Sequence, residues 1–463
     1  MEKNQQLGAV SISRFDEDGA GIADHEGAAI RLPGTLPGDV VDLTLLKRRR
    51  RQWFGRVESR VADSADRVEP RCEHFGSCGG CKLQHLAYSA QLAEKERRLH
   101  VLLDPLLSAD RPEWLPIIPS PDQYHFRNKL EFSFGSRRWL TAAEIASSGE
   151  IAPRPAAGFH PPRQFDKILH LETCHLMTEP ANALRKTLYD FAQERGLSFF
   201  DVKARHGLLR TLMVRISSLG EVMAVISFGA DEPENIDAVI AHMQAEFPGI
   251  TSLQHTVNLK GNDTIWDLPL TVDAGRDYIV EELCGLRFHV RAKSFLQTNT
   301  GQTQRLYAGI RDFCDLRETD RLLDLYCGVG AIGLSLAGDC AHVHGIEEVP
   351  AAIADAHRNA SRNNVGNASF QEGRAEDLLA DVDFVADVAV VDPPRVGLHA
   401  RAMVALRQLA PRRIVYVSCN PKALARDLVA LAGDYRISKL QPVDMFPHTL
   451  HVETIAALER KSE

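Results

Sequence analysis

Residues 321–333 read Arg321-Leu-Leu-Asp-Leu-Tyr-Cys-Gly-Val-Gly-Ala-Ile-Gly333. An apolar run is followed by closely spaced glycines, which is typical of a buried strand, a tight turn and the start of a helix. Glycine allows positive φ and lets the backbone approach a bound molecule closely. Glu347 ends the next apolar run, 19 residues after Gly328. That spacing suits a carboxylate that accepts hydrogen bonds from a ribose.

From this stretch onward the chain alternates strand and helix patterns at the steps of βαβ units. The expected strands are 322–325, 342–346, 369–371, 388–391, 414–417, 437–441 and 454–458. They predict an α/β fold, with a Rossmann-like domain over 291–463 built on a mostly parallel seven-stranded sheet.

The upstream residues predict two more domains. Residues 7–62 alternate apolar and polar with frequent turns, which indicates about five short strands in an OB-like β-barrel over 1–65. Residues 66–290 are expected to form a central α+β domain, with a helix over 86–103 and a hairpin of 208–215 with 222–228.

Composition bounds the compartment and the partners. The chain has 463 residues, and its 44% hydrophobic and 25% charged content is ordinary for a soluble protein. It has neither a membrane-length apolar stretch nor a signal peptide, and nine irregularly spaced cysteines favour a reducing compartment, so we expect a cytoplasmic protein. The net charge of −8 argues against a uniformly basic nucleic-acid binder. Lys47-Arg-Arg-Arg-Arg51 is a local basic cluster, although such runs are more often solvated faces.

Three loops carry groups suited to chemistry. Ser418-Cys-Asn-Pro421 and Asp392-Pro-Pro-Arg395 each follow an expected buried strand, and residues 444–453 form the third loop. Loops at the carboxyl ends of parallel strands converge on one edge of the sheet. We therefore expect one active site there, with a thiol from Cys419 and carboxylates from Asp392 and Glu453.

A thiol together with a base is the pair of groups that methylation of uracil at carbon 5 requires. Carbon 5 of uracil is too poor a nucleophile to attack a methyl group, and thiolate addition at carbon 6 makes it reactive. A base must then remove the carbon 5 proton. Cys419 is the expected nucleophile and Glu453 the expected base. Cys327 is a competing thiol, but its place inside the glycine turn indicates a buried core residue.

These motifs resemble those of the RNA (uracil-C5)-methyltransferase family. The matching stretches are Asp392-Pro-Pro-Arg-Val-Gly397, Ile414-Val-Tyr-Val-Ser-Cys-Asn420 and Val443-Asp-Met-Phe-Pro-His-Thr-Leu-His-Val-Glu453. The resemblance implies an S-adenosylmethionine (SAM) methyltransferase domain and a TRAM-like barrel, with Cys419 as nucleophile and Glu453 as base. It implies cofactor contacts from Gln297, Tyr326, Gly328, Gly330, Glu347 and Asp392. Ala423, where the family usually has threonine, and Ala331 depart from the pattern.

Cysteines at the spacing Cys72-x5-Cys78-x2-Cys81 predict a ligand set that needs a fourth member, for which Cys174 is the candidate. Four thiolates can hold zinc or an iron–sulfur cluster, and spacing alone does not separate the two. The family resemblance implies a 4Fe-4S cluster, with zinc as the alternative.

The resemblance implies RNA as the partner. Because the tRNA branch of that family usually lacks the barrel and the cysteine cluster, the resemblance implies 23S rRNA as substrate, with tRNA as the alternative. The enzyme should flip its uracil out of the stack. We expect a monomer without an obligate protein partner and without a membrane. Two readings of other classes stay open: an amino-methyltransferase, suggested by Asp-Pro-Pro, and a non-catalytic RNA-binding or chaperone-like module.

Overall fold

The computed structural model describes residues 1–50, 52–108, 110–141, 144–145, 154–379 and 384–461. Arg51, the last residue of the basic cluster, lies outside the described residues. The chain forms two compact units, unit 1 with Met1–Lys95 and Pro447–Leu450, and unit 2 with Glu96–Phe446 and His451–Glu463. Among the helices so described, none combines the length and the apolar character that a membrane crossing requires.

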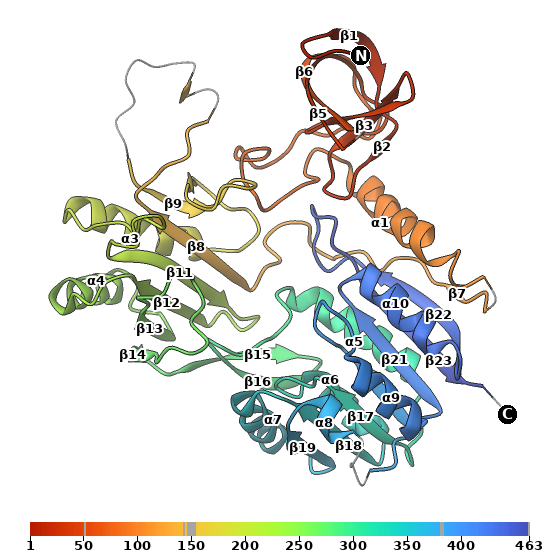
Figure 1. The fold of residues 1–463 in the computed structure, drawn as a ribbon. Helices are drawn as coiled ribbons and strands as arrows, with labels where there is room; N and C mark the ends of the chain where they lie inside the picture. Colours follow the sequence, from red (N-terminus) through yellow and green to blue (C-terminus); the bar gives the residue numbers. More distant parts are fainter. Residues whose placement is uncertain (51, 109, 142–143, 146–153, 380–383, 462–463) are drawn as a thin grey trace. The chain divides into compact units, whose positions relative to one another are not determined.

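Unit 1 is built on a six-stranded sheet in the order β1-β5-β6-β4-β3-β2, which curls round on itself (Figure 1, red). Its strands are β1 (Gln6–Ser11), β2 (Arg14–Phe15), β3 (Gly21–His25), β4 (Ala28–Leu32), β5 (Val40–Arg49) and β6 (Gln52–Ala62). Alternating side chains such as Val41, Leu43 and Leu45 are buried and form its core. The predicted helix over 86–103 is α1 (Tyr88–Leu103).

The upstream part of unit 2 contains a seven-stranded sheet in the order β10-β9-β8-β11-β12-β13-β14. Its elements are β8 (Lys129–Gly135), β9 (Ala156–Phe159), β10 (Leu169–His170), α3 (Ala181–Glu194), β11 (Leu209–Ile216), β12 (Val222–Phe228), α4 (Pro233–Glu246), β13 (Ser252–Val257) and β14 (Thr271–Gly275). The predicted hairpin is confirmed, because β11 and β12 pair antiparallel with Met213 opposite Val225. A separate ribbon of β15 (Tyr278–Leu283) and β16 (Leu286–Arg291) follows.

The C-terminal sheet has eight strands in the order β19-β18-β17-β20-β21-β23-β22-β7. They are β7 (Glu113–Trp114), β17 (Arg321–Leu325), β18 (His342–Glu347), β19 (Ala368–Glu372), β20 (Val388–Val391), β21 (Arg413–Ser418), β22 (Tyr435–Val443) and β23 (Glu453–Arg460). All seven predicted strands are present. The eighth, β7, pairs with β22 and was not predicted, because two residues carry no periodicity.

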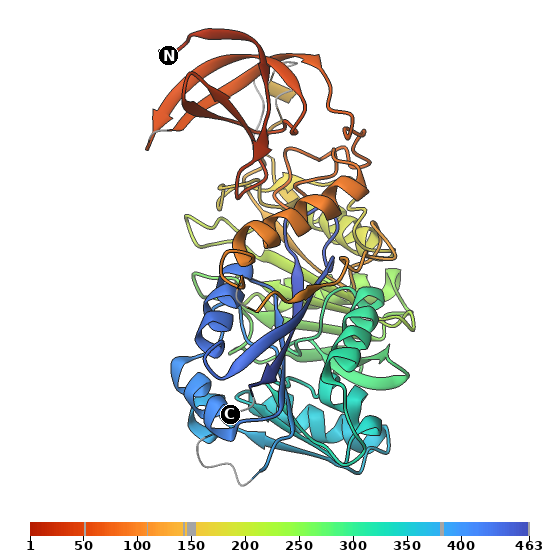
Figure 2. The same cartoon turned by 90° about the vertical axis from the view of Figure 1, so that its right-hand side faces the viewer.

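The first five strands of that order are parallel, and β20 and β21 among them are buried on both faces. β20 is fully buried, and residues 414–417 of β21 are all 0% exposed, as expected for strands covered by helices on each side. The helices are α5 (Thr300–Cys314), α6 (Ala331–Leu336), the 3₁₀ turn η1 (Ala337–Asp339), α7 (Pro350–Arg362), α8 (Ala375–Leu378), α9 (Ala400–Leu409) and α10 (Pro421–Leu431). Figure 2 shows α9 and α10 on one side of the sheet and α5 on the other.

Strand order reverses between β17 and β20, because the chain first builds outward through β18 and β19 and then returns to the other side of β17. At such a switch point the loops diverge and leave a crevice outside the carboxyl ends of the strands. The sequence-predicted glycine turn and the Asp392 loop both leave the sheet at this point.

Candidate active site

Cys419 and Glu453 are brought together by strand pairing. β21 runs antiparallel to β23, and Ser418 pairs with Thr454. The next residue of β21's loop, Cys419, therefore lies beside Glu453, the first residue of β23. Directly opposite residues in such a ladder have Cα atoms about 4.5–5.5 Å apart. Cys419 is half-buried, whereas the Glu453 side chain is only 3% exposed.

The loop after β20 adds two charged groups to this pair. β20 is the parallel neighbour of β21, with Val391 opposite Tyr416, so Asp392 leaves the sheet one strand away from Cys419. Asp392 and Arg395 both interact electrostatically with Cys419 and Glu453. The thiol, both carboxylates and the guanidinium therefore share one site at the carboxyl edge.

Burial dominates the electrostatics of the carboxylates. It raises the pKa of Glu453 to about 8, with the Asp392 charge adding to the rise and Arg395 opposing it. Burial likewise raises the pKa of Asp392 to about 7. A carboxylate that must ionise in a desolvated site is a stronger base than one in water, so Glu453 has the properties of a general base that works near neutral pH.

The thiol of Cys419 responds to the same groups. Burial raises its pKa, Glu453 and Asp392 raise it further, and Arg395 lowers it. The thiolate is therefore favoured when the neighbouring carboxyls are protonated or when Arg395 stays close. The competing thiol, Cys327, is buried, and burial raises its pKa well above the usual value. It also lies only 2.8 Å from the position that a Cβ on Gly345 would take, which places it in the packed interior as predicted.

Three residues of the glycine turn after β17 have positive φ angles. Tyr326, Gly328 and Gly330 have φ of 62°, 55° and 81°, and positive φ is rare for a tyrosine. The Gly328 N–H donates to Glu347 at 3.2 Å, which ties the turn to the end of β18. The strained tyrosine is a feature that the surrounding structure must enforce, as is common at functional sites.

Asp324 lies beneath this turn with one oxygen unused. Its Oδ2 accepts from the Gly333 N–H at 2.8 Å, and its Oδ1 has no partner among the described protein atoms. Burial raises the pKa of this 0% exposed carboxyl to about 7, with the charges of Asp392 and Glu347 adding to the rise. A buried oxygen without a partner is costly, and an incoming donor from a bound molecule would relieve it.

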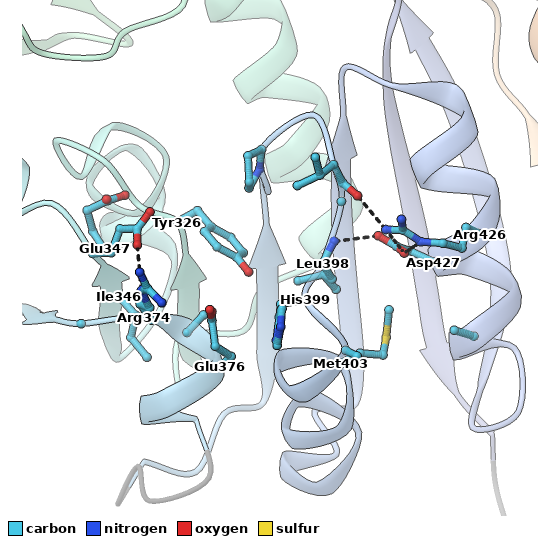
Figure 3. Close-up of a pocket in the computed structure, with 18 residues that line it drawn as sticks. Tyr326, Ile346, Glu347, Arg374, Glu376, Leu398, His399, Met403, Arg426 and Asp427 are labelled. Carbon is cyan, nitrogen blue, oxygen red and sulfur yellow. Dashed lines mark hydrogen bonds and ion pairs between the residues drawn. The ribbon is translucent and has the colours of Figure 1, made fainter. Parts of the chain in front are cut away.

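A pocket of about 660 Å³ opens beside the turn (Figure 3). Tyr326 and Glu347 line it, whereas the predicted contacts Gln297, Gly328, Gly330 and Asp392 are not among the lining residues. The lining also contains residues that the sequence reasoning missed, which are Glu348, Arg374, Glu376, His399, Met403, Arg426 and Asp427. Arg374 and Glu376 follow β19 directly, so their place after a parallel strand was the available signal.

Gln297 is part of the turn that precedes α5. Its carbonyl accepts from Asn128 Nδ2 at 3.0 Å, and the same amide donates to Thr300 Oγ1 at 2.9 Å. Asn299 caps α5 by accepting from the Gln302 N–H. The hydrogen bond from Asn128, the residue directly before β8, therefore fixes the backbone of Gln297.

The four cysteines of the predicted ligand set belong to different units. Cys72, Cys78 and Cys81 are half-buried in unit 1, and Cys174 is buried in unit 2. The Gly80 N–H donates to Cys78 Sγ at 3.4 Å, and Cys72 interacts electrostatically with Cys78, so these two thiols are neighbours. Within the described ranges, no group of three or more His, Cys, Asp or Glu side chains is arranged to hold a metal ion.

Comparison with known proteins identifies the family. The tRNA (uracil-5-)-methyltransferase family model matches residues 269–461, which include every predicted catalytic and cofactor-binding residue. An uncharacterized RNA methyltransferase of Porphyromonas gingivalis is 40% identical over 98% of this chain and 100% of its own length. A second, from Bacteroides thetaiotaomicron, is 40% identical over 96% of this chain and 99% of its own length. The chain belongs to the RNA (uracil-C5)-methyltransferase family.

A solved structure agrees with this family over almost the whole chain. The tRNA (uracil-54, C5)-methyltransferase of Pyrococcus abyssi, in complex with S-adenosyl-L-homocysteine, is 28% identical. It covers 97% of this chain and 99% of its own, with a TM-score of 0.75. Because the family consists of RNA methyltransferases, the alternative of a non-catalytic module is rejected. Because the family acts on carbon 5 of uracil, the alternative of an amino-methyltransferase is rejected as well.

Proposed function

We propose that this protein transfers a methyl group from SAM to carbon 5 of uracil in RNA, with Cys419 as nucleophile and Glu453 as general base. The observation that carries the proposal is the pairing of Ser418 with Thr454, which puts a half-buried thiol next to a buried carboxyl. Arg395 lowers the pKa of both groups and so favours the ionised forms that the reaction needs.

The residues of the glycine turn suit the cofactor. Glu347 lines the pocket and can accept from ribose hydroxyls, and the unpartnered Oδ1 of Asp324 offers a further acceptor beneath the turn. Tyr326, Gly328 and Gly330 expose backbone in a conformation that allows close approach. Gln297 and Asp392 are proposed as further contacts. SAM, when bound, supplies an electrophilic methyl group on a sulfonium centre.

The chain's own residues carry the remaining chemistry. The Cys419 thiol gives up its proton to water, and the thiolate Sγ adds to carbon 6 of a flipped-out uracil, which moves the electron pair of the 5,6 double bond into an enolate and makes carbon 5 nucleophilic. Once carbon 5 is methylated, the Glu453 carboxylate removes the remaining proton from it. The electron pair of that C–H bond re-forms the 5,6 double bond and expels the thiolate of Cys419, so the enzyme is restored.

Release of the carbon 5 hydrogen tests this function directly. RNA tritiated at uracil carbon 5 should lose its label to water when the protein and SAM are both present. Release that needs neither SAM nor Cys419, or no release from any rRNA or tRNA preparation, contradicts the proposal.

We further propose a 4Fe-4S cluster held by Cys72, Cys78, Cys81 and Cys174. The Gly80 N–H to Cys78 Sγ bond supports it, because cluster sulfurs are commonly stabilised by such donors. Zinc on the same thiols is the alternative. Iron, acid-labile sulfide and zinc analysis of protein purified without oxygen separates the two.

As substrate we propose 23S rRNA. As domains we propose a TRAM-like, RNA-binding barrel over 1–65, an iron–sulfur and central α+β RNA-binding domain over 66–290 and a catalytic domain over 291–463. The exposed residues Lys47, Arg48, Arg49 and Arg50 extend the first of these with positive charge suited to an RNA backbone. tRNA is the second candidate, because the Pyrococcus tRNA enzyme matches the N-terminal part as well. Nucleoside mapping of rRNA and tRNA from cells that lack the protein decides between the two substrates.

We further propose that the protein is a cytoplasmic monomer.

A further inference from the structure

The loop that carries Arg395 is tied to α10 by side chains from that helix and its cap. Asn420 Nδ2 donates to the Arg395 carbonyl at 2.8 Å, and Arg426 Nη2 donates to the Val396 carbonyl at 2.8 Å. The Leu398 N–H donates to Asp427 Oδ2 at 2.8 Å. Three backbone groups within four residues are therefore held by the segment that begins directly after Cys419.

Asp427 is the centre of this arrangement. Its side chain is 2% exposed, and besides the Leu398 N–H it accepts from the Tyr416 hydroxyl at 2.6 Å and from Arg426 Nε at 2.8 Å. Tyr416 is 0% exposed, in the middle of β21. A buried carboxylate with this many donors fixes its partners in place, because moving any of them leaves a desolvated charge unsatisfied.

Gly397 shows how closely the loop approaches the helix. Its φ is +82°, and a Cβ there would lie 2.4 Å from Asp427 Oδ2 and 2.3 Å from Arg426 Nη2. The same Cβ would lie 3.2 Å from that of Ala423. The contact therefore needs glycine in the loop, and the backbone cannot slide along α10 without losing it.

We propose that Asp427, with Asn420 and Arg426, is a positioning residue that fixes the backbone of the Arg395 loop, so that the guanidinium stays beside Cys419 and Glu453. The proposal rests on the function given above, in which Cys419 is the nucleophile. Arg395 is exposed, and the effect of its charge on the thiol falls with distance. The contacts of Asn420, Arg426 and Asp427 with the loop backbone, here called the clamp, fix the position from which the Arg395 side chain extends.

The ionisation of Cys419 is the readout, measured without RNA or SAM. The alkylation rate of Cys419 is followed against pH by mass spectrometry of its peptide, in wild type, Asp427→Asn and Arg395→Gln. The charged groups that face the thiol are Glu453, Asp392 and Arg395. With Arg395 displaced, we expect the thiol pKa in Asp427→Asn to rise by about 0.5, or roughly threefold less thiolate at neutral pH.

The sign of the change distinguishes positioning from a direct charge effect. Removing a negative charge would by itself lower the thiol pKa if it acted at all, whereas displacement of the Arg395 guanidinium raises it. The double variant should show no larger rise than Arg395→Gln alone, because both changes act through the same guanidinium. A lowered or unchanged pKa in Asp427→Asn, or additive effects in the double variant, overturns the proposal.

Two further variants guard against a folding artefact. Asp434→Asn is the matched control, because Asp434 follows the C-terminal end of α10 and its carboxylate pairs with Arg407 of α9. This variant should leave the thiol pKa unchanged. If Asp427→Asn does not fold, Tyr416→Phe is used instead, because it removes one hydrogen-bond donor to Asp427 and keeps the charge. We expect a smaller rise of the Cys419 thiol pKa in this variant. An unchanged thiol pKa would count against the clamp. Absence of any adduct between wild-type Cys419 and 5-fluorouracil RNA would instead contradict the proposed function, and would leave the clamp measurement interpretable.

Discussion

Replacing Glu453 with glutamine should separate the two halves of the reaction. The variant can still add Cys419 to uracil and methylate carbon 5, but it lacks the base that removes the proton. General bases of this kind contribute roughly 10²–10⁴ to rate, so tritium release should fall by about that factor. The covalent RNA–protein complex should accumulate instead of turning over.

The structure gives a reason to expect that addition survives. Glu453 raises the pKa of the Cys419 thiol, so removing its charge lowers that pKa and increases the thiolate fraction at a given pH. Glutamine is nearly isosteric with the protonated acid, so the buried site keeps its shape. The substitution should not lower the stability of the folded state either, because the pKa of Glu453 is raised in the fold.

The folded-state pKa of Glu453 is raised from the ordinary 4.5 to about 8, so stability is lost as pH rises through that window. Each pKa unit corresponds to 1.36 kcal/mol, so ionising Glu453 in the folded state costs at most roughly 4–5 kcal/mol. Glu453→Gln removes this cost, and above pH 8 its melting temperature should equal or exceed that of wild type.

The assay uses SAM, unmodified substrate RNA and denaturing gels, with intact mass to confirm one RNA and one added methyl group for each chain. Glu459→Gln is a matched control, because that acid lies on the same strand but pairs with Arg413 and Arg436, away from the thiol. The reasoning is refuted if Glu453→Gln loses the covalent complex together with turnover while remaining folded.

Three other outcomes are expected. Arg395→Gln should shift the rising limb of the pH–rate profile to higher pH, because Arg395 lowers the pKa of both Cys419 and Glu453, and an unshifted limb in steady-state assays would count against this role. Gly333→Ala should lower the free energy of unfolding by about 1–3 kcal/mol in urea titrations, since its Cβ would lie 2.8 Å from Asp324 Oδ2, and an unchanged stability would show that the turn can relax. Cys78→Ala should lose most bound iron and lower the melting temperature by metal analysis and calorimetry, whereas full iron content would exclude it as a ligand.

The buried strands were predictable because their residues face the interior on both sides. Runs such as Val388–Val391 are continuously apolar, and the structure buries all of them. The carboxyl-edge site followed from the same reasoning, since parallel strands share a polarity. The adjacency of Cys419 and Glu453 was harder to derive, because it depends on β23 entering the sheet between β21 and β22 in antiparallel register.

Other features depend on tertiary burial that local sequence does not encode. Arg426-Asp427 resembles an ordinary solvated pair on a helix, yet Asp427 is enclosed by Tyr416 and the Leu398 N–H. β7 is too short for a periodic signal, and Arg374 and Glu376 enter the pocket only because β19 ends beside β18.

The most direct test of the account is covalent capture by RNA that contains 5-fluorouracil. Fluorine at carbon 5 cannot be removed as a proton, so the methylated adduct should persist, and peptide mapping should place the RNA on Cys419. The account predicts this adduct in wild type and its absence in Cys419→Ala. A linkage to Cys327 or to any other residue, or a stable adduct in Cys419→Ala, would contradict it.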